Sequence, residues 1–266
     1  MKNYETLIIE SNEPVLTVIL NRPQKANAMS KQMIEELMDV LIQLRYEERY
    51  KYVVFTGSGK YFTGGADLSE FLTDIESGTF TPSANRLLQM YGQEFMQKIE
   101  NLEQITITAI NGPMYGAGVA LALCCDFRIM AENSIICVPE AERGTFFTWG
   151  STPRLVSIVG PAKAKELIML CNPVTAMEAQ RIGFANQVVA DEALIDSVQL
   201  MIASMERSPF LPLRLTKKIV NAAAAPTFGN ILPYEPELME QVSMSGDFQN
   251  GINQFLKSKK NSIKNN

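Results

Sequence analysis

The chain has 266 residues, of which 46% are hydrophobic and 20% charged, so it can bury a full core within one large domain. Its formal net charge of −5 argues against a nucleic-acid partner. The sequence contains no histidine, which excludes Ser-His and Cys-His nucleophile pairs, histidine metal sites and histidine acid/base catalysis. Proton transfer near neutral pH must therefore fall to carboxylates, tyrosine, lysine, cysteine or water.

The sequence shows no segment typical of export or membrane insertion. Residues 1–5 lack the apolar run of a secretory signal, and the longest apolar stretch, 119–125, is too short to cross a bilayer. The four cysteines have neither CxxC spacing nor histidine companions, which is typical of buried thiols in a reducing compartment. We therefore expect a cytoplasmic protein with no membrane partner and no metal site.

The N-terminal part of the chain predicts a hairpin followed by a helix. Residues 6–10 and 15–20 alternate in polarity around a turn that contains Pro14, which is typical of a β-hairpin. Ser30 is a helix-capping residue, and apolar residues recur at helical spacing after it. The spacing predicts a helix over 30–48 with one buried face.

Two glycine-rich junctions between a strand and a helix are the most informative feature of the sequence. Residues 61–68 (YFTGGADL) follow a predicted strand at 52–56, and residues 111–118 (NGPMYGAG) follow one at 105–110. Small residues at such junctions leave backbone N–H groups exposed. Two of these donors directed at one oxygen form an oxyanion hole, which stabilises an enolate or a tetrahedral oxyanion. Taken singly, each segment is equally consistent with a tight turn.

A helix is predicted over 85–102, and short strands are predicted near 127–131 and 134–138. After them, the predicted elements are mostly helices. The predicted C-terminal elements are helices over 162–170, 176–182, 191–206, 209–224 and 233–242, with one strand over 187–189. We therefore predict an α/β catalytic core over residues 1–195 and a helical C-terminal region over residues 196–266.

Four segments match, in order and spacing, the crotonase (enoyl-CoA hydratase/isomerase) family, which the chain resembles over nearly its whole length. They are residues 21–28, 62–68, 111–118 followed by 125–128, and 139–140. The resemblance implies a crotonase-like spiral of repeated β-β-α units with a helical C-terminal layer. It also implies an enzyme of acyl-CoA thioesters, with coenzyme A as part of the substrate and no permanently bound cofactor. A homotrimer or a dimer of trimers is expected on the same ground.

The resemblance places three catalytic positions in this sequence. The two oxyanion-hole N–H groups fall on Gly64 and Ala117, and the acid/base carboxylate falls on Glu140 in a Pro-Glu sequence. Family hydratases carry a second glutamate where this chain has Ala120. Hydration is helped by two carboxylates, whereas moving a double bond needs one base that removes a proton and returns it nearby. We therefore expect conversion of a 3-enoyl-CoA to a 2-enoyl-CoA, with hydration of a 2-enoyl-CoA as the alternative and Glu142 as a second candidate base.

The family's CoA site matches residues from several parts of this chain. They are Lys25, Ala26, Ala66, Asp67, Leu68, Phe255, Lys257 and Lys259. The basic part of the match is imperfect, because Ser258 stands where a lysine is expected and the flanking lysines would have to replace it. For the side chain of Asp67, capping of the following helix is the simpler role.

Several residues near Glu140 allow more than one interpretation. Phe146, Phe147 and Trp149 either wall an acyl pocket or belong to the core, and Arg143 is expected to pair with a carboxylate. A different class of function also remains open, because some family members bind RNA or have lost activity. No dense basic helix supports RNA binding in this chain.

Overall fold

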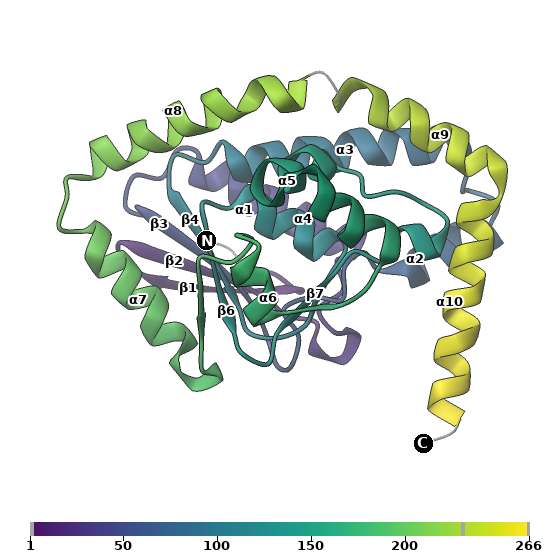
Figure 1. The fold of residues 1–266 in the computed structure, drawn as a ribbon, viewed down its shortest axis with the longest axis horizontal. Coiled ribbons are helices and arrows are strands. Elements are labelled where there is room, and N and C mark those ends of the chain that lie inside the picture. The colour runs from purple at the N-terminus through teal and green to yellow at the C-terminus, as the bar shows by residue number, and fades with distance from the viewer. Residues whose placement is uncertain (1–2, 230–231, 265–266) are drawn as a thin grey trace.

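Helices surround a central sheet in this protein, and three C-terminal helices run along its outside (Figure 1). The computed structural model describes residues 3–229 and 232–264, and within them it leaves out the side chains of 225–229 and 258–264. The predicted α/β class with a helical C-terminal layer is confirmed.

The central sheet has six strands whose order in space is their order along the chain. They are β1 (Leu7–Asn12), β2 (Val15–Leu20), β3 (Tyr52–Gly57), β4 (Ile105–Ile110), β6 (Phe127–Ala131) and β9 (Gln187–Val189). The hairpin pair β1 and β2 is antiparallel, and the remaining neighbours are parallel. The carboxyl ends of β3 and β4 therefore lie at one edge, where both glycine-rich junctions begin.

A smaller sheet connects the two junctions with the segment that carries Glu140. Its strands are β5 (Met114–Tyr115), β7 (Ile135–Cys137) and β8 (Val174–Thr175). Thr63 of the first junction forms a parallel bridge with Met114, and the N–H of Gly116 donates to the carbonyl of Cys137 at 3.0 Å. These bonds place both junctions beside the end of β7, three residues before Glu140.

Alternate residues of the central strands face two different layers of helices, as expected for a pleated strand. Val53 and Phe55 belong to a core that includes α1 (Lys31–Leu44), α3 (Pro82–Glu100), α4 (Ala117–Cys124) and α5 (Ser151–Leu170). On the other face, Tyr52 and Val54 pack with α7 (Leu194–Met205). The sheet is therefore covered on both sides.

Two predicted boundaries differ from the structure. The boundary predicted after residue 195 cuts α7, whose buried residues pack against the central sheet, so the outer helical region begins with α8 (Phe210–Gly229). Helix α5 begins at Ser151, whereas the predicted helix begins at residue 162, so about half of α5 was not predicted. Gly160 interrupts it with φ 77° and ψ 161° directly before Pro161, which explains why the pattern indicated only the second half.

The outer helices connect the two ends of the core. Helix α9 (Glu235–Ser245) packs along α3, and α10 (Asp247–Lys264) packs against the short 3₁₀ helix η2 (Ala141–Arg143) that follows Glu140. In Figure 1, α10 then runs away from the core toward the C-terminus. The remaining helices are α2 (Leu68–Glu76) after the first junction and α6 (Ala176–Arg181) before β9.

Candidate active site

A cavity of about 80 Å³ lies where the two junctions meet the segment after β7. Residues from both junctions, from that segment and from five helices, α2, α3, α4, α9 and α10, line it. Those that concern the chemistry are Ala66, Ala117, Ala120, Glu140, Gln89 and Trp149. The structure therefore brings together Ala117 and Glu140, two of the three predicted catalytic positions.

The third predicted position, Gly64, is wrong. Its N–H donates to the carbonyl oxygen of Ala26 at 2.7 Å, so this donor already has a strong acceptor and is not free for a substrate oxygen. Gly64 also lines a neighbouring cavity and not the one that contains Glu140. The glycine pattern correctly identified the junction but not the residue whose N–H is exposed.

Ala66, two residues later, has the free N–H of this junction. The N–H groups on either side of it are occupied, because Gly65 donates to Thr63 Oγ1 at 3.2 Å and Asp67 donates to the carbonyl of Met29 at 3.0 Å. Ala66 forms a parallel bridge with Met29, an arrangement in which its own N–H points to the opposite side. No acceptor for this N–H lies within the described part of the chain.

Ala117 offers a second free N–H from the other junction. It is the first residue of α4, where a backbone N–H has no partner within the helix and lies at the positive end of the helix dipole. The two junctions touch here: a Cβ atom built on Gly65 would lie 3.6 Å from the nitrogen of Ala117 and 2.9 Å from the carbonyl oxygen of Tyr115. A side chain at position 65 would therefore separate the two junctions.

Glu140 presents a carboxylate with one unpartnered oxygen to the same cavity. Its Oε2 is buried and has no hydrogen-bond partner among residues 3–229 and 232–264. Burial raises the pKa of Glu140 to about 7, and a hydrogen bond from its own backbone N–H and the positive charge of Arg143 offset only part of this effect. A carboxyl group with such a pKa both accepts and donates a proton near neutral pH.

Gly116 allows Glu140 to approach the second junction. Its φ of 44° and ψ of −108° lie outside the regions that other residues readily adopt. A Cβ atom at this position would also collide with Glu140 Oε1. The backbone conformation therefore favours glycine here, and a side chain at this position would displace the carboxylate that packs against it.

The neighbours of Glu140 differ from their predicted roles. Arg143 was expected to form an ion pair, but its guanidinium lies over the ring of Phe255 at 4.5 Å, and no ion pair of Arg143 is found in the described ranges. Glu142, the second candidate base, is exposed and does not line the cavity. Phe146, with Phe147 and Trp149, lines the cavity, so the acyl-wall interpretation of these aromatic residues is compatible with the geometry.

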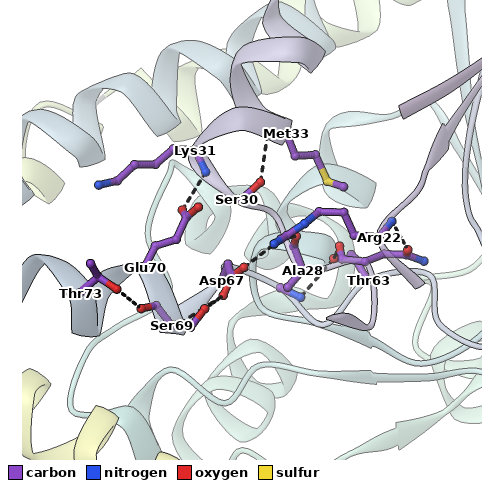
Figure 2. A network of polar contacts seen from close by, with 12 residues as sticks. Arg22, Ala28, Ser30, Lys31, Met33, Thr63, Asp67, Ser69, Glu70 and Thr73 are labelled. Atoms are coloured by element: carbon purple, nitrogen blue, oxygen red, sulfur yellow. Dashed lines mark hydrogen bonds and ion pairs between the residues drawn. The ribbon is translucent and has the colours of Figure 1, made fainter. Parts of the chain in front are cut away.

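The side chain of Asp67 has a structural role, as its sequence position predicts (Figure 2). Its side chain accepts from the N–H of Ser69 at 3.2 Å and caps α2, and it forms an ion pair of 2.8 Å with Arg22. Burial by itself would raise the pKa of Asp67, but the hydrogen bonds from Ser69 and Arg22 and the charge of Arg22 lower it below its usual value.

A second cavity of about 350 Å³ continues from the first, since Ala66, Leu68 and Arg143 line both. Six of the eight residues predicted for the CoA site line it, namely Lys25, Ala26, Ala66, Asp67, Leu68 and Phe255. Lys257 is exposed on α10 and does not line it, and the side chain of Lys259 lies outside the described residues.

The sequence analysis did not identify Gln89 of α3 and Met239 of α9, which also line the first cavity. Neither lies in a motif, because each reaches the cavity only through the packing of α9 along α3. Among the described helices, none combines the length and apolar character needed to cross a membrane. In the same residues, no group of three or more His, Cys, Asp or Glu side chains is arranged to hold a metal ion.

Comparison with known proteins agrees with this geometry. Residues 10–266 match the family model described as enoyl-CoA hydratase/isomerase. The crotonyl-CoA hydratase of Syntrophomonas wolfei is 31% identical over 97% of both chains, and the 1,2-epoxyphenylacetyl-CoA isomerase of Escherichia coli is 27% identical over 95% of both. The crystal structure of an enoyl-CoA hydratase from Bacillus anthracis superposes with a TM-score of 0.76 at 28% identity, covering 91% of this chain and 90% of that one.

Proposed function

From the premise that this chain belongs to the enoyl-CoA hydratase/isomerase family, we propose that it moves the double bond of a 3-enoyl-CoA thioester to position 2. The observation that carries the proposal is a single buried carboxylate with an unpartnered oxygen, Glu140, in a cavity where the position of a second family glutamate holds Ala120. A shift of a double bond needs one base that removes a proton and returns it to a nearby carbon.

In the proposed reaction, the thioester oxygen accepts hydrogen bonds from the N–H groups of Ala66 and Ala117. Glu140 removes a proton from C2, and the electron pair of the broken C–H bond forms a dienolate whose negative charge is spread onto that oxygen. The same carboxyl group then delivers the proton to C4, which leaves the double bond between C2 and C3. Loss of one such N–H donor typically costs about 10²- to 10³-fold in rate.

The proposal places the two parts of the substrate in the two connected cavities. The acyl group lies in the cavity with Glu140, and the CoA portion lies in the larger one beside Lys25 and Phe255. A lysine stabilises a phosphate through its charge and needs no fixed geometry, so an exposed Lys25 suits this role. We also propose that the protein binds no permanent cofactor and works as a cytoplasmic homo-oligomer of the trimeric kind found in the family.

The test compares the rates of the wild-type protein with two substrates. The wild-type protein should convert a short 3-enoyl-CoA to the 2-enoyl-CoA faster than it adds water to crotonyl-CoA. Glu140→Gln should remove the isomerisation, whereas Glu142→Gln, which changes an exposed neighbour, should leave it within about threefold of wild type. Retained turnover by Glu140→Gln would show that another group moves the proton.

Hydration of a 2-enoyl-CoA is the second candidate, favoured by the 31% identity to the crotonyl-CoA hydratase of Syntrophomonas wolfei. In this reaction Glu140 alone would have to remove a proton from the attacking water and deliver a proton to C2. Faster hydration of crotonyl-CoA than isomerisation of a 3-enoyl-CoA would favour it. Ala120→Glu provides a second measure, because restoring a second carboxylate should raise hydration only if Glu140 alone is insufficient for it.

A further inference from the structure

Besides Glu140, the wall of the active-site cavity includes a second polar side chain with an unused acceptor. Gln89 of α3 is only 4% exposed, and its Oε1 is buried without a hydrogen-bond partner in the described chain. The side chains that line the cavity with it are largely apolar, among them Phe71, Phe147 and Met239. An unsatisfied buried amide oxygen costs about 1–3 kcal/mol, so it calls for an explanation.

The neighbouring hydrogen bonds decide which end of the Gln89 amide is left over. The backbone oxygen of Met239 can only accept, and the Ser243 hydroxyl donates to it at 2.8 Å. Ser243 Oγ therefore accepts from Asn85 Nδ2 at 2.7 Å, which turns Asn85 Oδ1 toward Gln89 Nε2 at 3.1 Å. Turning the Gln89 amide round would bring two acceptor oxygens together. The free group is thus an oxygen, and only a donor can satisfy it.

We propose that Gln89 Oε1 accepts a hydrogen bond from a hydroxyl group on the acyl chain, so that the substrates are hydroxylated acyl-CoA thioesters. The inference rests on the proposed function, because it needs the acyl group to lie in the cavity that Gln89 shares with Glu140 and Ala117. A volume of about 80 Å³ holds several water-sized groups, which suits a short acyl chain with one polar end.

The O–H donor has two possible sources, the substrate or a water molecule held in the cavity, and they differ in a measurable way. A hydroxyl on the acyl chain is held at a fixed number of bonds from the thioester carbon, so Gln89 would select both its presence and its position. A bound water would satisfy Gln89 with any acyl chain. A site that hydrogen-bonds a substrate hydroxyl discriminates strongly against the analogue that lacks it, because the protein group is then left unpaired.

The experiment compares pairs of 3-enoyl-CoA thioesters that differ only in a terminal hydroxyl or a methyl group, over a series of short chain lengths. At one length or more, kcat/KM of the wild-type protein should be about tenfold or more higher for the hydroxylated member. Gln89→Met should remove that preference, so that kcat/KM for the two members of each pair becomes equal within about threefold. Gln97→Met is the matched control, since Gln97 is exposed on the same helix.

Equal kcat/KM within every pair would overturn the inference and identify water as the donor. The comparison within the wild-type protein remains decisive even if Gln89→Met does not fold. Calorimetric binding of saturated hydroxyacyl-CoA and methyl analogues separates this inference from the proposed function, because it needs no turnover. Tighter binding of the hydroxylated analogue, by about tenfold, supports the role of Gln89 even if isomerisation fails. Equal binding contradicts that role even if isomerisation is confirmed.

Discussion

Asp67 and Glu140 are two carboxylates at the start of helices beside connected cavities, yet their pKa values shift in opposite directions. Asp67 accepts hydrogen bonds from Ser69 and from Arg22, which hold it ionised. Glu140 is buried with an unpartnered oxygen, and the nearby Arg143 lies over an aromatic ring. Both carboxylates are affected by burial, so the difference comes from the partners that the fold supplies.

The comparison separates a structural carboxylate from a chemical one. A paired carboxylate stabilises the fold and is a poor base, because its negative charge is already compensated. An unpaired one lowers the stability of the fold at neutral pH but can take up and release a proton there. The predictions below change one member of this pair, or its surroundings, and follow the consequence.

The largest effect is expected from removing the charge of each carboxylate in turn. Glu140→Gln should lower kcat for isomerisation by about 10²- to 10⁴-fold, because no other group replaces the proton carrier. Asp67→Asn should lower kcat by less than about tenfold, because asparagine still caps α2. Steady-state rates with a 3-enoyl-CoA measure both. Similar losses for the two variants would remove the distinction between the carboxylates.

Gly116→Ala should reduce activity next most strongly. The new methyl group collides with Glu140 Oε1 and must displace the carboxylate, so we expect kcat to fall by about 10- to 10²-fold. The control is Gly78→Ala, which also places a side chain at positive φ (71°) but meets no atom within 4 Å. In both variants the free energy of unfolding should fall by about 1–3 kcal/mol, as measured by denaturant unfolding. Only Gly116→Ala should lose activity. Equal activity would show that Glu140 tolerates displacement.

The pH profile of isomerisation should follow the raised pKa of Glu140. The base must be ionised to remove the proton from C2, so kcat/KM should fall about tenfold for each pH unit below about 7 and level off above it. Asp67→Asn should leave this profile unchanged, since Asp67 remains ionised throughout that range. A profile that stays flat down to the ordinary glutamate value of 4.5 would contradict the assignment.

The smallest effects should appear in stability, with opposite signs for the two carboxylates. Folding raises the pKa of Glu140, so its destabilising contribution develops as the pH rises from 4.5 to about 7. Above that range, Glu140→Gln should raise the free energy of unfolding by about 1–3 kcal/mol. Folding lowers the pKa of Asp67, so its stabilising contribution is present above 3.8 and is lost as the pH falls through the lower, folded-state value.

Asp67→Asn should therefore lower the free energy of unfolding by about 1–3 kcal/mol near neutral pH, because Arg22 loses its charged partner. Urea unfolding of both variants at neutral and at acid pH measures the two differences. Both should shrink at acid pH, where the carboxylates of the wild-type protein become protonated in the folded and the unfolded chain. A destabilised Glu140→Gln at neutral pH would show that the carboxylate has a stabilising partner after all.

Local patterns were sufficient for most elements of this fold. The strand at 105–110 and the helix capped by Ser30 lie where β-branched alternation and helical spacing predict them. At α5 the pattern found the second helical part, which follows the break at Gly160 and Pro161, but missed the first part, which begins at Ser151. Helix α10 falls within the predicted helical C-terminal region, but its bounds were not predicted, and it packs against η2.

The order of four short segments along the chain determined the family and the identity of Glu140 as the candidate base, because motifs and their spacing are carried by the sequence itself. Which N–H group of the first junction is free was decided by the bridge between Ala66 and Met29, since consecutive N–H groups of an extended segment point in opposite directions. The unpaired state of Glu140 and the free oxygen of Gln89 likewise arise only in the folded chain, because a hydrogen-bond partner is defined by position in space and not by distance along the sequence.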